Sequence, residues 1–146
     1  NLKVIIMLKN SNLITFFFTL LVVFIFSCTA APRYTSLQTI YGLSSHYGHN
    51  DGFHGKRTAN GEIFNQHKLS AAHKTLPLNT WVRVTNMDRL TKPSVKLKIN
   101  DRGPYVGDRI LDCSSAAAKK LGFFEKGTAN VKVEVLKWGD NKYHKH

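Results

Sequence analysis

Residues 94–104 read SVKLKINDRGP and join a strand pattern to a sharp turn. Aliphatic side chains alternate with lysines in the first half: Val95, Leu97 and Ile99 against Lys96 and Lys98. The same kind of alternation recurs over residues 80–86 and 131–136. Because successive side chains of a strand point to opposite faces, these patterns predict half-buried strands. We expect the strands to close into a small β-barrel, which leaves no strand edge exposed.

One helix is expected beside the strands. Ser114 or Ser115 can cap its start, and three alanines at 116–118 favour helix. Two lysines suit its last turn, and Gly122 ends it. Cys113, just before the helix, is interpreted as a small buried apolar residue. The predicted fold class is therefore mainly β.

The second half of the opening stretch places an acid on a turn. Gly103 frees the backbone and Pro104 fixes φ, so the Asp101 carboxylate is expected at a strand end. Two other short blocks also hold an ionisable residue among small neighbours: Glu62 in TANGE and His73 in AAH. Taken singly, Asp101 would be interpreted as a turn-forming residue, Glu62 as an exposed surface acid, and His73 as a core histidine whose hydrogen bonds are satisfied. Together they suit a site where a carboxylic acid moves a proton.

The order of the blocks resembles the RlpA (rare lipoprotein A) family of bacterial envelope lytic transglycosylases. The resemblance covers residues 41–136 and implies a six-stranded double-psi β-barrel with one or two short helices. Two positions depart from the family pattern, since Cys113 replaces an aliphatic residue and His46 replaces Trp or Tyr. The blocks are GLSSHYG (42–48), GKRTANGE (55–62), LSAAHKTLP (69–77), VRVTN (82–86), NDRGPY (100–105) and RILDCS (109–114).

The resemblance implies an endolytic enzyme that cleaves between N-acetylmuramic acid and N-acetylglucosamine in peptidoglycan. It implies a preference for strands without stem peptides and 1,6-anhydro-muramyl products. Its catalytic residues map to Asp101 and Glu62, with His73 as a third required polar residue. We expect Asp101 to act as general acid and then base, and Glu62 to stabilise charge at C1 or raise the pKa of Asp101. Which carboxylate is the acid stays open. The alternative is a non-catalytic, expansin-like polysaccharide-binding protein.

Four further residues are expected to bind substrate: Tyr47, Asn100, Arg102 and Arg109. An aromatic face can stack on a sugar ring, and an arginine can pair with a lactyl carboxylate. The two arginines can equally brace neighbouring acids, and Trp81 can be either a sugar contact or a packing residue. The bracing alternatives are Asp101, Asp108 and Asp112.

No cofactor or metal is predicted. His46, His49, Asp51 and His54 lie close enough in sequence to suggest metal ligands. The run is rich in glycine and has no strand or helix to fix ligand geometry, so a polar loop is the favoured interpretation.

An apolar leader precedes the barrel. Residues 1–27 are expected to be a signal peptide, with translation starting at Met7. Its apolar run, 13–26, has fourteen residues and is shorter than the ~20 that a membrane-spanning helix needs. Cys28 then resembles the lipidated cysteine of a lipoprotein, with residues 28–38 as a tether. The alternative is an ordinary secretory signal cut after Ala30 or Ala31.

Composition indicates the partners. Lys and Arg number 21 against nine Asp and Glu, a net charge of +12. Such an excess of positive charge favours the binding of polyanions. Because an exported protein rarely meets nucleic acid, we expect the partner to be an acidic glycan strand. Residues 39–137 are expected to be one barrel domain, and residues 138–146 a basic, frayed tail. No SPOR domain is expected. We expect a monomer, anchored through Cys28 and facing the periplasm, in the outer membrane.

Overall fold

Six strands form a closed barrel in the computed structural model, which describes residues 38–145. The leader, the proposed start at Met7 and the lipidation site Cys28 lie outside the described residues. The strands are β1 (Thr39–Tyr47), β2 (Ser70–His73), β3 (Trp81–Asn86), β4 (Ser94–Asp101), β5 (Arg109–Ser114) and β6 (Ala129–Lys137), with one helix, α2 (Ser115–Leu121). The mainly β, six-stranded barrel predicted from the sequence is confirmed.

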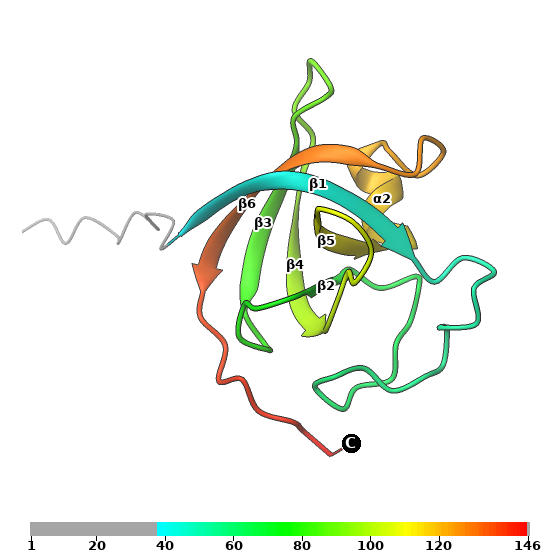
Figure 1. Ribbon diagram of the computed structural model, residues 1–146, viewed down its shortest axis with the longest axis vertical. Helices are drawn as coiled ribbons and strands as arrows, with labels where there is room; N and C mark the ends of the chain where they lie inside the picture. Colours follow the sequence, from blue (N-terminus) through cyan, green and yellow to red (C-terminus); the bar gives the residue numbers. More distant parts are fainter. Residues whose placement is uncertain (1–37, 146) are drawn as a thin grey trace, which may run out of the picture. The chain divides into compact units, whose positions relative to one another are not determined.

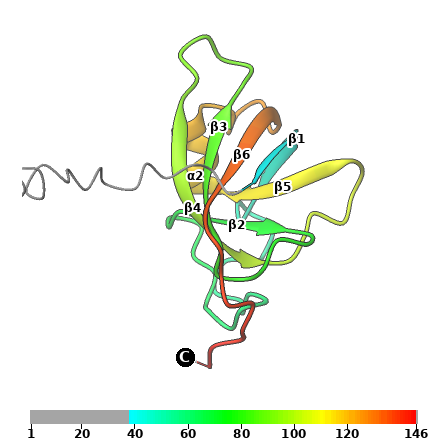
Figure 2. The ribbon, with the colours of Figure 1, turned by 90° about the vertical axis from the view of Figure 1, so that its left-hand side faces the viewer.

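Strand order around the barrel is β1-β5-β2-β4-β3-β6. The β1–β5 and β2–β4 pairs are parallel, and the other four pairs are antiparallel. Figure 1 shows β1 crossing in front of the barrel, with β3, β4 and β6 on one side and α2 on the other. Figure 2 shows the long loop between β4 and β5 extending away from the barrel. This topology places β2 between β4 and β5, although β3 separates β2 from both of them in sequence.

The barrel interior is filled by aliphatic side chains. Val82 and Val84 of β3, and Leu97 and Ile99 of β4, are fully buried, whereas Arg83 between the valines is exposed. The alternation in the sequence is therefore the alternation between core and solvent. Cys113 is also fully buried, and burial raises the pKa of its thiol to about 12. Cys113 is a packing residue, as predicted.

Helix α2 begins and ends where its caps predict. Ser114 is the N-cap, and its hydroxyl oxygen accepts a hydrogen bond from the backbone N–H of Ala117. Gly122 is the C-cap with φ 74°, a left-handed conformation that glycine adopts without steric cost. No helix within residues 38–145 is long and apolar enough to cross a bilayer.

The C-terminal segment differs from its prediction as a frayed tail. Its backbone and side chains bind the barrel end between residues 139 and 144. The Asn141 side-chain oxygen accepts from the backbone N–H of Leu78 at 3.0 Å, and the backbone N–H of His144 donates to the Asn60 carbonyl at 2.7 Å. The segment is largely exposed to water, and its polar groups also form hydrogen bonds with loops at the barrel end.

Candidate active site

Asp101 lies at the end of β4, on the turn that Gly103 and Pro104 predict. One carboxylate oxygen, Oδ1, accepts two backbone N–H groups, from Ala59 at 3.0 Å and from Arg102 at 2.9 Å. The other oxygen, Oδ2, accepts the hydroxyl of Tyr47 at 3.4 Å. Backbone donors thus fix the orientation of the carboxylate and leave Oδ2 toward Tyr47.

A small cavity of about 170 Å³ opens beside Asp101. Its floor includes Ala72, which pairs with Asp101 on one neighbouring strand and with Asp112 on the other. Asp101, Ala72 and Asp112 therefore form one row across β4, β2 and β5. Because adjacent strands lie about 4.8 Å apart, the Cα atoms of the two acids are separated by roughly 10 Å. The methyl side chain of Ala72 leaves the space between them open.

Asp112 is the second carboxylate of this cavity, and the sequence had suggested it only as a partner for an arginine. The Ser45 hydroxyl donates to Asp112 Oδ1, and Arg109 donates to the Ser45 oxygen at 2.8 Å. Gly103 lies beside Asp112, since a Cβ at this position would be 3.9 Å from Asp112 Oδ2, an ordinary van der Waals contact. The alternation of buried Leu111 and Cys113 around Asp112 is the signal that could have identified it.

Tyr47 lines the cavity together with both acids, and its hydroxyl donates to Asp101. Burial of its ring, together with the nearby charges of Asp101 and Asp112, raises the pKa of the hydroxyl, which therefore stays protonated as a donor. Its ring stacks on Phe64 with centroids 4.3 Å apart. The predicted substrate-binding residue Tyr47 is thus placed in the cavity with Asp101.

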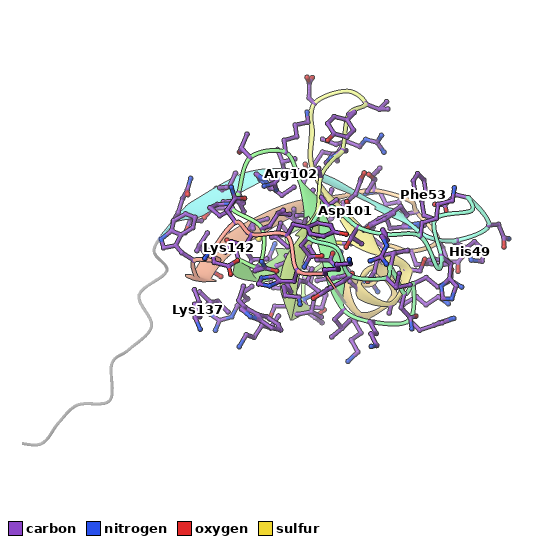
Figure 3. The ribbon with its side chains drawn as sticks, turned by 90° about the horizontal axis from the view of Figure 1, so that it is seen from below. His49, Phe53, Asp101, Arg102, Lys137 and Lys142 are labelled. Carbon is purple, nitrogen blue, oxygen red and sulfur yellow. The ribbon has the colours of Figure 1, made fainter. Side chains whose placement is uncertain are left out.

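Two aromatic residues beside the cavity were missed from the sequence. Phe53 and Tyr105 both line it, and their exposed fractions are 49% and 80%. In the view of Figure 3, Asp101 and Arg102 lie between the loop that carries Phe53 and the C-terminal segment that carries Lys142. Exposed aromatic faces beside paired acids are suited to contact sugar rings.

Glu62 does not share the Asp101 cavity. Its carboxylate forms an ion pair with Lys98 and accepts the Asn100 side-chain N–H at 3.0 Å. It lines a separate hollow on the outer side of the barrel. Burial alone would raise its pKa, but the bonds from Lys98 and Asn100 outweigh burial and lower the pKa of Glu62. The ionised form is therefore favoured, which suits a binding group better than a proton donor.

Asn100, also predicted to bind substrate, lies with Glu62 rather than with Asp101. The loop 58–62 contacts both of these residues of β4, because the backbone N–H of Ala59 donates to Asp101 and the Glu62 carboxylate accepts from Asn100. Adjacent residues of β4 thus serve two different hollows.

His73 is buried, with 6% of its surface exposed. Its Nδ1 accepts the backbone N–H groups of Thr75 and Leu76 at 3.1 and 3.0 Å. Burial, followed by the charges of Arg102 and Lys74, lowers the pKa of His73 to about 4. The structure therefore places a neutral histidine that stabilises the turn after β2, and its ring hydrogen bonds within residues 38–145 go to this turn and not to either acid.

Both predicted arginines are engaged with protein acceptors. Arg102 donates to the carbonyl oxygens of His73 and Leu76 and to the Asn141 side chain. Arg109 braces Asp112 through Ser45 and also donates to the Val106 carbonyl at 3.0 Å. Arg109 thus braces Asp112 indirectly, through Ser45, whereas the Arg102 side chain donates to carbonyl and amide oxygens and not to an acid.

The histidine-rich loop after β1 does not gather ligands. His46 Nε2 lies 3.0 Å from the Phe124 carbonyl, and Asp51 accepts the backbone N–H groups of Gly48 and Phe53. Within residues 38–145, no group of three or more His, Cys, Asp or Glu side chains is arranged to hold a metal ion.

Comparison with solved structures relates the barrel to known folds. It superimposes on the Streptomyces papain inhibitor with a TM-score of 0.53 at 18% identity, covering 68% of this chain and 96% of the inhibitor. The TM-score is 0.52 for apo Clavibacter michiganensis expansin at 20% identity, covering 68% of this chain and 51% of the expansin. At these identities the likeness shows a shared fold alone.

Sequence comparison is more specific. The chain is similar to proteins named endolytic peptidoglycan transglycosylase RlpA. Identity is 56% over 95 residues in Pseudomonas aeruginosa (65% of this chain, 27% of the relative) and 47% over 119 residues in Rickettsia felis (81% and 51%). The chain thus spans between about a quarter and a half of the length of these relatives. Residues 27–133 match the family described as lytic transglycolase. With its double-psi β-barrel and its RlpA relatives, this chain belongs to the lytic transglycolase family.

Proposed function

We propose that the protein is an endolytic transglycosylase that cleaves peptidoglycan between N-acetylmuramic acid and N-acetylglucosamine. The observation that supports this proposal is the cavity in which Asp101 and Asp112 lie on either side of Ala72, with the Tyr47 hydroxyl bonded to Asp101. Enzymes that break glycosidic bonds usually carry two carboxylates, one on each side of the bond that is cleaved. The names of the relatives point to the same reaction.

The reaction uses Asp101 twice. In its acid form Asp101 donates a proton to the glycosidic oxygen as the bond from that oxygen to C1 of the muramic residue breaks. Positive charge develops at C1, and the Asp112 carboxylate stabilises it. The C6 hydroxyl of the same sugar then attacks C1, and the Asp101 carboxylate takes the hydroxyl proton. The products are a 1,6-anhydro-muramyl end and a free glucosamine hydroxyl, and no water is consumed.

The remaining predicted residues support this centre from outside. Tyr47 holds Asp101 Oδ2, and Arg109 holds Asp112 through Ser45. His73 and Arg102 fix the turn after β2. Glu62 contributes to a binding surface and does not transfer a proton, because its charge is already neutralised by Lys98 in another hollow.

The preferred substrate is a strand without stem peptides. Removal of the peptide exposes the lactyl carboxylate of muramic acid, which the positive charge of the chain attracts. Phe53 and Tyr105, which line the cavity, can contact the sugar rings of a bare strand.

The test is incubation of the purified protein with peptide-free strands, followed by mass spectrometry. We expect anhydro-muramyl products from the natural protein and none above background from Asp101→Asn. If the natural protein binds strands but releases no anhydro product between pH 4 and 8, the enzyme proposal is wrong. The non-catalytic binding alternative then stands.

We also propose that the protein acts as a monomer in the cell envelope, anchored by a lipid on Cys28 and facing the periplasm from the outer membrane. The support is the apolar run that ends at Ser27-Cys28, followed by Thr29. Cells fed labelled palmitate should label the natural protein and not Cys28→Ala. Equal labelling of the two would contradict the anchor.

A further inference from the structure

The outer surface of β3, β4 and β6 carries a basic patch apart from the Asp101 cavity. Trp81 pairs with Lys98 on β4 and with Lys137 on β6, and Arg83 pairs with Lys96. We call these five outward residues the Trp81 face. Figure 3 shows Lys137 and Phe53 on opposite sides of Asp101.

The charge of the Trp81 face is largely unneutralised. Lys98 is paired with Glu62, but no ion pair joins Arg83, Lys96 or Lys137 to an acid in the described part of the chain. Glu134, the cross-strand neighbour of Arg83, is paired with Lys132 instead. The Lys96 ammonium lies 4.9 Å from the centroid of the Trp81 ring. The face therefore presents positive charge around an aromatic ring.

The surface around Trp81 is hollowed. A hollow of about 510 Å³ lies among Trp81, Arg83, Lys96 and Lys137. Another, of about 470 Å³, includes Trp81 and Trp138, and a third, of about 430 Å³, extends from Trp81 past Lys98 to Asn100. Adjoining hollows of this kind can hold an extended polymer such as a glycan strand. A membrane surface is flat and would instead contact a convex part of the protein.

Asn100 adds a polar signal in the third hollow. Its side chain is 4% exposed and lines that hollow, and its nitrogen donates to Glu62. Its Oδ1 has no hydrogen-bond partner among the described residues. A buried acceptor without a donor is costly, so a ligand hydroxyl or amide N–H that supplies one is favoured.

We propose that the Trp81 face is a second glycan-binding site, for an N-acetylated strand that carries carboxylates. A sugar ring stacks on Trp81, Arg83 and the two unpaired lysines bind the carboxylates, and an amide or hydroxyl of the strand satisfies Asn100. The identity of the ligand rests on the proposed function. The site itself does not, since it requires no cleavage.

The experiment measures binding of peptide-free murein strands in an Asp101→Asn background, so that the strands stay intact. The test variant combines Arg83→Gln, Lys96→Gln and Lys137→Gln. The matched control combines Lys92→Gln, Lys119→Gln and Lys120→Gln, which removes the same charge from the β3–β4 hairpin and from α2. We expect the test variant to bind about tenfold more weakly and the control within about twofold of the parent.

Two further probes identify the ligand. Chitin hexasaccharide has the N-acetylated backbone without carboxylates, and we expect it to bind the parent at least tenfold more weakly than murein strands and to be insensitive to the three substitutions. Phosphatidylglycerol vesicles test a membrane surface. Equal loss in the test and control variants, equal affinity for chitin, or loss of vesicle binding alone would each overturn the proposal. Natural protein that binds through this face but makes no anhydro product would instead refute only the enzyme assignment.

Discussion

At the scale of single residues, the two acids of the cavity are held in different ways. Asp101 is fixed by backbone N–H groups, whereas Asp112 is fixed by a side-chain relay through Ser45 to Arg109. A backbone-held acid keeps its position while its proton leaves and returns. The Ser45 relay orients the Asp112 carboxylate at the cavity that Asp101 also lines. In the proposed reaction Asp101 carries the proton and Asp112 stabilises charge.

The first prediction concerns Asp112. Asp112→Asn keeps the shape and removes the charge, so we expect kcat on peptide-free strands to fall by roughly 100- to 1000-fold with little change in strand binding. Asp108→Asn, at an exposed position in the loop before β5, is the control and should retain activity. Initial rates and binding isotherms measured together check both. Comparable kcat in the two variants would remove Asp112 from the reaction.

The second prediction follows from the lowered pKa of His73. Between about pH 6.5 and pH 4 the unfolded chain takes up a proton on this residue that the folded chain refuses. Stability from this group is therefore complete above pH 6.5 and is lost as pH falls toward 4, by roughly 2 kcal/mol.

Two measurements check the His73 prediction. Urea unfolding between pH 7 and 5 should show the loss of stability, and His73→Gln should flatten that slope. The imidazole resonances of the folded protein should titrate near pH 4 for His73. A midpoint near 6.5 would show that the ring is not held neutral.

At the scale of elements, the site depends on β2 lying between β4 and β5. Ala72 is the only residue between the two acids in their row, and it is 3% exposed. We expect Ala72→Val to fold at a cost of about 1–3 kcal/mol and to lose at least tenfold in rate, because the added methyl groups enter the cavity. Ala129→Val, at a buried position of β6 outside the cavity, is the matched control. If the activity of both variants falls only in proportion to the fraction of folded protein, Ala72 has no specific role in keeping the cavity open.

The elements also show what a sequence can and cannot predict. Strands β3, β4 and β6 have one face in the core and one in water, so their alternation is visible. All four residues of β2 are buried, and a strand without a wet face shows no alternation. Helix α2 is set by local caps at Ser114 and Gly122, and these were readable.

The site was harder to predict than the fold. The blocks predicted Asp101 as a site residue, but the separation of Glu62 from it and the row that it forms with Asp112 depend on which strands are neighbours. The parallel β2–β4 pair and the antiparallel β2–β5 pair join segments that are separated in sequence. The spacing of residues along the chain therefore does not reveal that Asp101, Ala72 and Asp112 form one row.

At the scale of the whole molecule, positive charge acts before any contact is made. The chain has a net charge of +12, and the carboxylates of a bare glycan strand are negative. Such attraction raises the rate of encounter and is screened by salt, whose Debye length shortens from about 30 Å at 0.01 M to about 8 Å at 0.15 M. The chemical step differs, because it takes place at fixed short distances inside the cavity.

The last prediction separates these two contributions. Raising NaCl from 0.01 to 0.15 M should lower kcat/KM on peptide-free strands by about tenfold while kcat at saturating substrate changes less than twofold. The Arg83, Lys96 and Lys137 triple substitution should reduce the salt dependence of kcat/KM, because fewer screened charges then contribute to capture. An equal fall of kcat would mean that salt acts on the cavity itself. In that case the carboxylates of the strand would be bound beside Asp101 and Asp112 rather than by the surface around Trp81.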